Sequence, residues 1–212
     1  MPLNRFLNLP QEDRERVLHI AKSQFAAHGY DNTSLNLLLK EIELSKGQFY
    51  YWFEDKADLF FTVMQEGLDA LQVRLEEHGL PKSKSEYWAH IHESRLIAEG
   101  FWEKNGFLEI GKMISQQIPA NHPIFPRLLE CGLPLQNHFR VGLEMGQEWG
   151  IVRTDLSVEV LLHLTEDVSD AFYKPMVHSY TSGLPPSDET LALHDLLGRT
   201  LLLILQPLSE GE

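Results

Sequence analysis

The stretch from Thr33 to Phe61 constrains the fold of this chain more than any other part of the sequence. It reads TSLNLLLKEIELSKGQFYYWFEDKADLFF, so apolar residues recur at helical spacing, stop at a short polar turn, resume, and end in an aromatic cluster. This pattern predicts two short helices joined by a tight turn, followed by an abrupt start to a longer helix. Small, polar and cationic residues precede the aromatic cluster. That arrangement is typical of a helix whose N-terminal residues enter the major groove of DNA.

The rest of the chain is also patterned as helices. Pro10 and Gly29 are typical first and terminating residues of a helix, and a long helix is expected from Asp55 to about His78. Further helices are predicted at about 84–103, 105–117, 123–149, 156–180 and 187–207. Neither a strand-like alternation nor an internal repeat is present. The sequence therefore predicts an all-α fold of about nine helices.

The charge distribution excludes a protein that coats nucleic acid through bulk positive charge. The formal net charge is −13. Residues 1–60 hold seven Lys or Arg and nine Asp or Glu, a net of −2, and residues 61–212 carry the remaining −11. The first quarter of the chain is thus nearly neutral, and any DNA contact must rest on a few placed cations, among them Lys40, Lys46 and Lys56.

Other sequence features exclude several classes of site. The single cysteine, Cys131, excludes an internal disulfide and a cysteine-rich zinc site. His90 and His92 are two residues apart and face different directions on a helix, so we expect no metal site. We find no phosphate-binding glycine loop or nucleophile motif, and expect neither a cofactor nor an enzyme. The longest strongly apolar run, LLLIL at 201–205, is too short for a membrane span, and a cytoplasmic protein is expected.

Two motifs within residues 14–61, FAAHGYDNTSL and SKGQFYYWFEDKADLF, give the chain a family resemblance. The stretch resembles the DNA-binding region of tetracycline-repressor-type (TetR family) transcriptional regulators. The resemblance implies a three-helix, helix-turn-helix DNA-binding domain at residues 1–54 and a ligand-binding and dimerisation domain at 55–212. It implies a sequence-specific repressor that binds a palindromic double-stranded operator as a homodimer. A small apolar or amphipathic effector would bind the second domain, shift the long 55–78 helix and release DNA.

The resemblance also assigns roles to individual residues. Lys46 and Gln48 are the candidates for contact with base edges, because lysine favours guanine acceptors and glutamine can pair with adenine. Thr33, Ser34, Tyr51 and Lys56 are expected on phosphates, which fixes register without reading sequence. The full set of expected DNA-binding residues is Thr33, Ser34, Ser45, Lys46, Gly47, Gln48, Tyr50, Tyr51, Trp52 and Lys56.

Four residues depart from the family pattern. Leu39 and Ile42 stand where the second helix usually has small residues, and Trp52 stands where histidine is more usual. Glu43 occupies a turn position that usually has glycine, and a left-handed backbone there costs a glutamate about 1 kcal/mol. These departures bear on sequence preference and DNA affinity rather than on the fold.

Apolar and aromatic residues beyond residue 81 supply the candidate effector pocket and dimer interface. The pocket candidates are Trp88, His92, Phe101, Trp102, Phe107, Met113, Phe125 and Phe139. Two long amphipathic helices near the C-terminus are expected to meet the same pair of a second subunit through Leu164, Val168, Phe172, Leu197, Leu201 and Ile204. The same residues also suit ordinary packing within one chain.

Two other functions stay open at this level. One is a ligand-binding or scaffold protein that kept the fold but no longer recognises an operator, which Ile42, Glu43, Trp52 and the acidic balance favour. The other is a helical enzyme that uses a cavity beyond residue 81, for which the sequence offers no catalytic arrangement.

Overall fold

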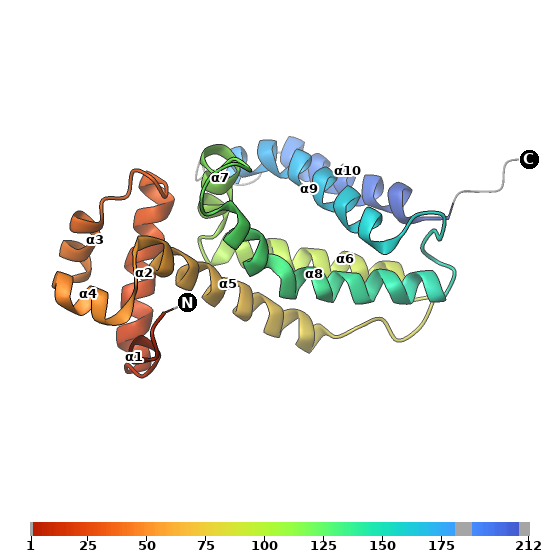
Figure 1. The fold of residues 1–212 in the computed structure, drawn as a ribbon. Helices are drawn as coiled ribbons and strands as arrows, with labels where there is room; N and C mark the ends of the chain where they lie inside the picture. Colours follow the sequence, from red (N-terminus) through yellow and green to blue (C-terminus); the bar gives the residue numbers. More distant parts are fainter. Residues whose placement is uncertain (1, 181–187, 208–212) are drawn as a thin grey trace, which may run out of the picture. The chain divides into compact units, whose positions relative to one another are not determined.

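The computed structural model describes residues 2–180 and 188–207, and every regular element in these ranges is an α-helix (Figure 1). The all-α prediction is therefore confirmed. The helices are α1 Asn4–Leu7, α2 Gln11–His28, α3 Leu35–Ile42, α4 Lys46–Trp52, α5 Lys56–His78, α6 Tyr87–Lys104, α7 Leu108–Gln117, α8 Phe125–Glu148, α9 Val158–Tyr180 and α10 Asp188–Leu205. The sequence did not predict α1, which is too short to show a helical period.

The chain divides into two compact units. Unit 1 contains the residues up to Leu71 together with Phe101–Leu133, and unit 2 contains Gln72–Gly100 and the residues from Pro134 onward. The DNA-binding domain expected at residues 1–54 lies wholly within unit 1. That unit also takes in the first part of α5, all of α7 and the start of α8.

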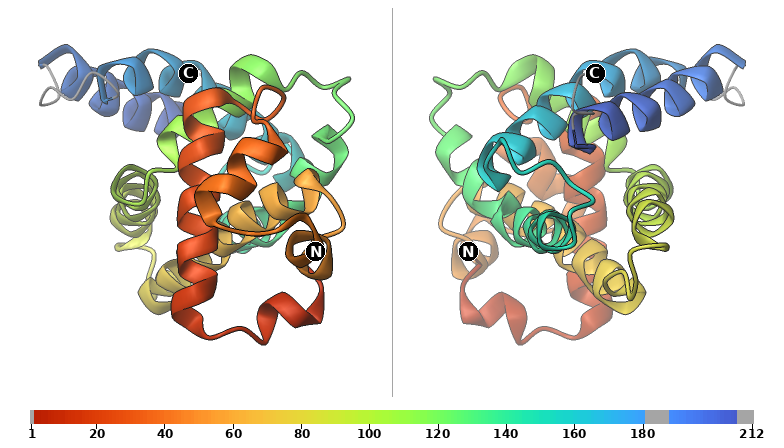
Figure 2. Two further views of the ribbon diagram at one scale, coloured as in Figure 1. Left: turned by 90° about the vertical axis from the view of Figure 1, so that its left-hand side faces the viewer. Right: turned by 90° about the vertical axis from the view of Figure 1, so that its right-hand side faces the viewer.

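The core of unit 1 is built where the apolar faces of its first helices meet. In α2 the buried residues Val17, Leu18, Ala21 and Phe25 recur at helical spacing. Figures 1 and 2 show α3 and α4 beside this helix. Phe25 meets Phe60 of α5 edge-on, with ring centroids 5.0 Å apart. Aromatic packing between α2 and α5 is thus part of this core.

Gly29 ends α2 in a conformation that a side chain would oppose. Its φ is +81°, and an added Cβ would lie 1.9 Å from Oε1 of Gln117. Its amide donates to the Phe25 carbonyl at 2.9 Å, which completes the last turn. The predicted end of this helix is confirmed.

Unit 2 has its own core around Tyr87. This ring is fully buried, and its hydroxyl donates to the Gly142 carbonyl at 2.9 Å. A Cβ on Gly146 would approach the Tyr87 hydroxyl to 2.4 Å, so a residue without a side chain is required there. The remaining core residues are Leu143, Val152, Val158, Leu161, Leu162 and Leu205. Helices α9 and α10 lie side by side (Figures 1 and 2).

Three general features of the described residues bear on function. None of their helices has an apolar stretch long enough to cross a bilayer. Their His, Cys, Asp and Glu side chains form no group of three or more that could hold a metal ion. Cys131, in α8, is half-buried as a free thiol.

Candidate nucleic-acid interface

Helix α4 begins with a complete capping box. The amide of Gln48 donates to Oγ of Ser45 at 3.2 Å, and the amide of Ser45 donates to Oε1 of Gln48 at 3.1 Å. Two backbone donors that an isolated helix leaves without partners are thus satisfied. The start of this helix is therefore fixed by the pair Ser45 and Gln48.

The turn between α3 and α4 is tight and left-handed. Glu43 has φ +63° and ψ +38°, and it is the one non-glycine residue with positive φ in the described chain. The amide of Leu44 donates to the Leu39 carbonyl at 2.8 Å and that of Glu43 to the Lys40 carbonyl at 3.3 Å. The left-handed backbone expected at this position is confirmed. Leu39 and Ile42, which replace small residues, are buried.

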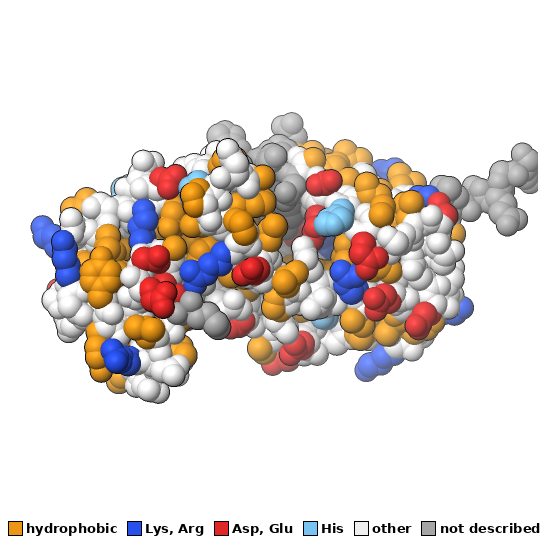
Figure 3. All heavy atoms as spheres, in the orientation of Figure 1, with side chains coloured by type: hydrophobic (Ala, Val, Ile, Leu, Met, Phe, Trp, Pro, Cys, Tyr) orange, Lys and Arg blue, Asp and Glu red, His pale blue; other side chains and the backbone are white. Residues whose placement is uncertain are grey.

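One side of α4 is anchored and the other is exposed. Phe49, within α4, and Phe53, directly after it, are both 0% exposed, and their ring centroids are 5.5 Å apart. The exposed residues of this segment are Ser45, Lys46, Gly47, Gln48, Tyr50 and Tyr51. In Figure 3, Lys and Arg side chains lie on the part of the surface formed by α3 and α4, with hydrophobic side chains among them. Six of the ten expected DNA-binding residues are therefore exposed on one side of this segment, around the buried Phe49.

Thr33 and Lys56 both donate hydrogen bonds to backbone carbonyls at the end of α2 and in the loop after it. Thr33 is buried, and its hydroxyl donates to the Gly29 carbonyl at 2.6 Å. The amine of Lys56 donates to the carbonyls of Tyr30 at 2.6 Å and Thr33 at 3.2 Å, and lies 4.5 Å from the Tyr30 ring centroid. Burial lowers the pKa of Lys56, although Asp31 opposes the shift. The Thr33 hydroxyl thus bonds back to the end of α2, and Lys56 ties the loop after α2 to the start of α5. The phosphate contacts expected of them are not what this geometry favours.

Ser34 differs from its neighbour Thr33. It stands at the N-cap of α3, but its side chain makes no capping hydrogen bond, and the residue is exposed. Its hydroxyl is therefore available to a phosphate beside the first amides of the helix, as expected from the sequence.

Helix α1 supports the far end of α4. The amide of Leu3 donates to the Trp52 carbonyl at 2.9 Å, and the Phe6 ring lies 6.0 Å from Trp52 and 4.7 Å from Phe53. Trp52 is only half-exposed because one face of it meets Phe6. These contacts make Trp52 chiefly a support for the exposed segment.

Arg5 is a residue near this surface that the sequence did not single out. It is exposed, and its guanidinium carbon lies 4.2 Å from the centroid of the Tyr51 ring. It adds a cation beside the exposed tyrosines. No motif marks it, because its place depends on how α1 packs against α4.

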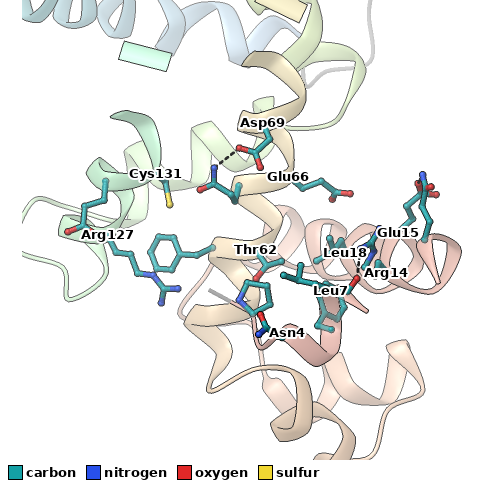
Figure 4. Close-up of a pocket in the computed structure, with 16 residues that line it drawn as sticks. Asn4, Leu7, Arg14, Glu15, Leu18, Thr62, Glu66, Asp69, Arg127 and Cys131 are labelled. Carbon is teal, nitrogen blue, oxygen red and sulfur yellow. Dashed lines mark hydrogen bonds between the residues drawn. The ribbon is translucent and has the colours of Figure 1, made fainter. Parts of the chain in front are cut away.

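The eight expected pocket residues fall in both units. Trp88, His92 and Phe139 belong to unit 2, and Phe101, Trp102, Phe107, Met113 and Phe125 belong to unit 1. Within unit 1, Phe101, Trp102 and Phe107 form an aromatic cluster with ring centroids 5.4–6.5 Å apart. Phe107 also fills the space above Gly67, where a Cβ would lie 2.3 Å from its ring. These three aromatic side chains pack against protein. None of the eight residues lines the open cavity of about 660 Å³ in unit 1 (Figure 4).

The residues expected at a dimer interface differ in exposure. Leu164 is 38% exposed, whereas Leu197 is 0% exposed and already covered by its own chain. Val168, Phe172, Leu201 and Ile204 are half-buried. Val160, Leu196 and Leu203 are exposed apolar residues of the same two helices that the sequence did not single out. An apolar strip thus remains uncovered on α9 and α10.

The sequence of this region matches a described family. Residues 17–63 match the family described as "Bacterial regulatory proteins, tetR family". The chain is 26% identical over 163 residues to the HTH-type transcriptional repressor AcnR of Corynebacterium glutamicum, which covers 77% of this chain and 81% of that protein. An HTH-type transcriptional regulator of Staphylococcus aureus is 39% identical over 59 residues, or 28% of this chain.

Solved structures share the fold at low sequence identity. The fatty acid degradation regulator FadR from Bacillus halodurans superposes with a TM-score of 0.71 at 16% identity, covering 92% of this chain and 97% of that one. FadR from Bacillus subtilis, solved in complex with stearoyl-CoA, has a TM-score of 0.69 at 16% identity, with 88% and 96% covered. At such identity these structures establish the shared fold.

Proposed function

Because this chain belongs to the tetR family of bacterial regulatory proteins, we propose that it is a dimeric, ligand-responsive repressor that acts in the cytoplasm and reads its operator through α4. The observation that carries the proposal is the exposed segment from Ser45 to Tyr51. Its backbone is fixed by the capping box, and its inner side is anchored by Phe49. A rigid exposed helix of this kind can enter a major groove through its N-terminal residues.

We assign base reading to Lys46 and Gln48. The lysine ammonium group can only donate hydrogen bonds. Oε1 of Gln48 already accepts one from the Ser45 amide. That bond occupies one lone pair of Oε1 and restrains the glutamine amide, whose N–H groups are the ones we propose for base contact. Donors fit the O6 and N7 acceptors of guanine, whereas bidentate pairing with adenine needs an acceptor as well. A half-site with guanine at the contacted positions is therefore expected.

Phosphate contacts are assigned to the exposed residues that flank α4. Ser34 offers a hydroxyl at the start of α3, and Tyr50 and Tyr51 offer phenol groups. Arg5 adds charge beside them. These groups position the helix without reading sequence. Thr33 and Lys56 act indirectly: Thr33 bonds the loop before α3 to the end of α2, and Lys56 holds that loop on the start of α5.

Dimerisation is assigned to the exposed strip of α9 and α10. Val160 and Leu164 lie four residues apart in α9, and Leu196 and Leu203 lie seven apart in α10, so each pair shares a helix face. A two-fold contact uses the same surface on both subunits and places two reading helices on two half-sites. A palindromic operator follows from that symmetry.

The effector is proposed to be a small apolar or amphipathic molecule. Stearoyl-CoA bound to Bacillus subtilis FadR shows that a protein of this fold accepts an amphipathic ligand. To release DNA, the effector must bind the conformation that fits the operator poorly more tightly than the one that fits it well.

The first test is selection of bound sites from a random duplex library at one fixed salt concentration. Enrichment of a palindrome is expected, and its half-site becomes the probe. Lys46→Ala and Tyr51→Ala should then abolish specific binding while leaving the dimer intact in sedimentation. Lys82→Ala is the matched control, because Lys82 is an exposed lysine of unit 2 outside the proposed interface.

Two results would contradict the assignment. Unchanged operator affinity in both variants would remove α4 from the reading role. Failure to enrich any sequence, with weak binding to every duplex, would instead indicate a ligand-binding protein of this fold that does not read an operator.

A further inference from the structure

An open cavity of about 660 Å³ lies in unit 1, a volume within the usual range for small-molecule sites (Figure 4). One side of α5 forms its floor. Residues of α8, including Arg127 and Cys131, lie on one side of that floor, and residues of α2, including Arg14 and Glu15, lie on the other. Helix α1 contributes Asn4, Phe6 and Leu7 to the lining. The cavity thus contacts four helices at once, and two of them belong to the DNA-binding domain.

The lining combines apolar surface with surplus negative charge. Phe6, Leu7, Leu18 and Phe61 supply the apolar part. Four carboxylates line the cavity, those of Glu15, Glu66, Asp69 and Glu130, against the two guanidinium groups of Arg14 and Arg127. Among the described lining residues, negative groups therefore outnumber positive groups by two.

Both guanidinium groups already have partners. Arg14 donates to the Leu7 carbonyl at 2.7 Å. Arg127 donates to Oδ1 of the buried Asp58 at 3.2 Å, and its guanidinium carbon lies 4.3 Å from the Phe61 ring centroid. Arg127 is thus balanced by a carboxylate that does not line the cavity. An anionic ligand would have to compete for these two cations.

The carboxylates are bonded to neutral groups or to none. Glu15 and Asp69 accept from the side-chain amides of Gln11 and Gln65, each at 2.7 Å, which leaves their charges in place. Within the described ranges, Glu66 and Glu130 make no ion pair. Burial raises the pKa of Glu66 even though Lys22 lowers it, so partial loss of water already disfavours its charge. A positive group in the cavity would relieve that cost.

One residue of the cavity lining also packs against the end of α4. Phe6 lines the cavity and is 1% exposed, and its ring also packs against Trp52 and Phe53. On the same short helix, Arg5 lies over the ring of Tyr51. A ligand that shifts α1 therefore changes the support of the last turn of α4.

We propose that this cavity binds an amphipathic organic cation, with its apolar body against Phe6, Leu18 and Phe61 and its positive group beside Glu66, and that binding weakens operator affinity through α1. The coupling to DNA rests on the function proposed above, whereas the binding site itself does not. A ligand that prefers a displaced α1 opposes the arrangement that holds Tyr51 and Trp52 for DNA.

Binding is tested by titration calorimetry on the full-length protein with octyltrimethylammonium and, as its matched anion, octanoate. The cation should bind and the anion should not. Glu66→Gln should weaken cation binding several-fold, and Cys131→Trp should abolish it by filling the cavity. Glu12→Gln, an exposed carboxylate of α2 outside the cavity, should leave it unchanged.

Cys131 also reports the location, because it is the one cysteine in the chain. Octyltrimethylammonium at ten times its dissociation constant should slow alkylation of this thiol by N-ethylmaleimide about tenfold by mass action, and octanoate should not. Equal binding of cation and anion, or cation binding that survives both Glu66→Gln and Cys131→Trp, would overturn the site.

The coupling is measured separately as the operator affinity of the wild-type protein with and without saturating cation. A loss of about fivefold or more is expected, the lower end of typical coupling between sites. Binding without this loss would overturn the coupling and leave the site. Failure of the library selection to give an operator would contradict the proposed function and would not affect the calorimetric result.

Discussion

At the scale of single residues, the region around α3 and α4 depends on side chains that form hydrogen bonds within the chain. Thr33 and Lys56 are polar and stand where phosphate contacts were expected, yet both donate to backbone carbonyls near the end of α2. Buried polar groups need such partners, because an unmet donor costs more than a typical hydrogen bond contributes. The residue types drew attention to these two positions. Their hydrogen bonds to the backbone indicate a structural role for both side chains.

Glu43 gives a residue-scale prediction. Its left-handed backbone conformation is unfavourable for any residue with a Cβ. Glu43→Gly should therefore raise the free energy of unfolding by about 1 kcal/mol. Glu41→Gly is the matched change inside α3, where glycine should lower it by about 1 kcal/mol. Urea unfolding at one fixed protomer concentration measures both. A loss of stability in Glu43→Gly would show that the glutamate side chain stabilises the turn.

At the scale of elements, the two short helices α3 and α4 have different N-terminal caps. Helix α4 has a reciprocal capping box, whereas the serine before α3 forms no side-chain cap. Helices of seven or eight residues are marginal alone, so α4 needs its cap and the packing of Phe49 and Phe53 to stay formed. Helix α3 is held instead by the burial of Leu38, Leu39 and Ile42.

This difference predicts unequal effects of the same substitution. Ser45→Ala should lower the free energy of unfolding by about 1 kcal/mol, because the amide of Gln48 loses the serine hydroxyl that accepts its hydrogen bond. Ser34→Ala should change it little, because no cap bond is lost. Thermal and urea unfolding of the two variants give the comparison. Equal losses would show that the capping box contributes nothing particular to α4.

At the scale of the whole molecule, the assembly depends on surface that one chain does not cover. The strip on α9 and α10 keeps Leu164 at 38% and Leu203 at 74% exposed, while Leu197 on α10 is fully covered. A single leucine on a surface is ordinary, but apolar residues in line on two neighbouring helices indicate an interaction site. One face of α10 therefore belongs to the monomer core and another to the proposed dimer.

The assembly prediction follows from that division. Leu203→Glu should convert the dimer to monomer in sedimentation at micromolar concentration, and operator affinity should fall with it, because each half-site must then be bound alone. Leu129→Glu places the same charge at another exposed leucine, on α8, and should leave the dimer intact. Retention of the dimer in Leu203→Glu would move the interface elsewhere.

The amino-acid pattern was enough to predict the helical class, the approximate limits of nine helices, the left-handed turn at Glu43 and the candidate segment from Ser45 to Tyr51. Each of these follows from contacts between residues a few positions apart, where period, caps and glycine act. The packing of distant segments was needed to show that Arg5 lies over Tyr51, that Lys56 bonds to the loop after α2, that Leu197 is covered, and that a cavity forms beside Glu66 and Cys131. These depend on segments that are tens of residues apart, and no local pattern records which of them will meet.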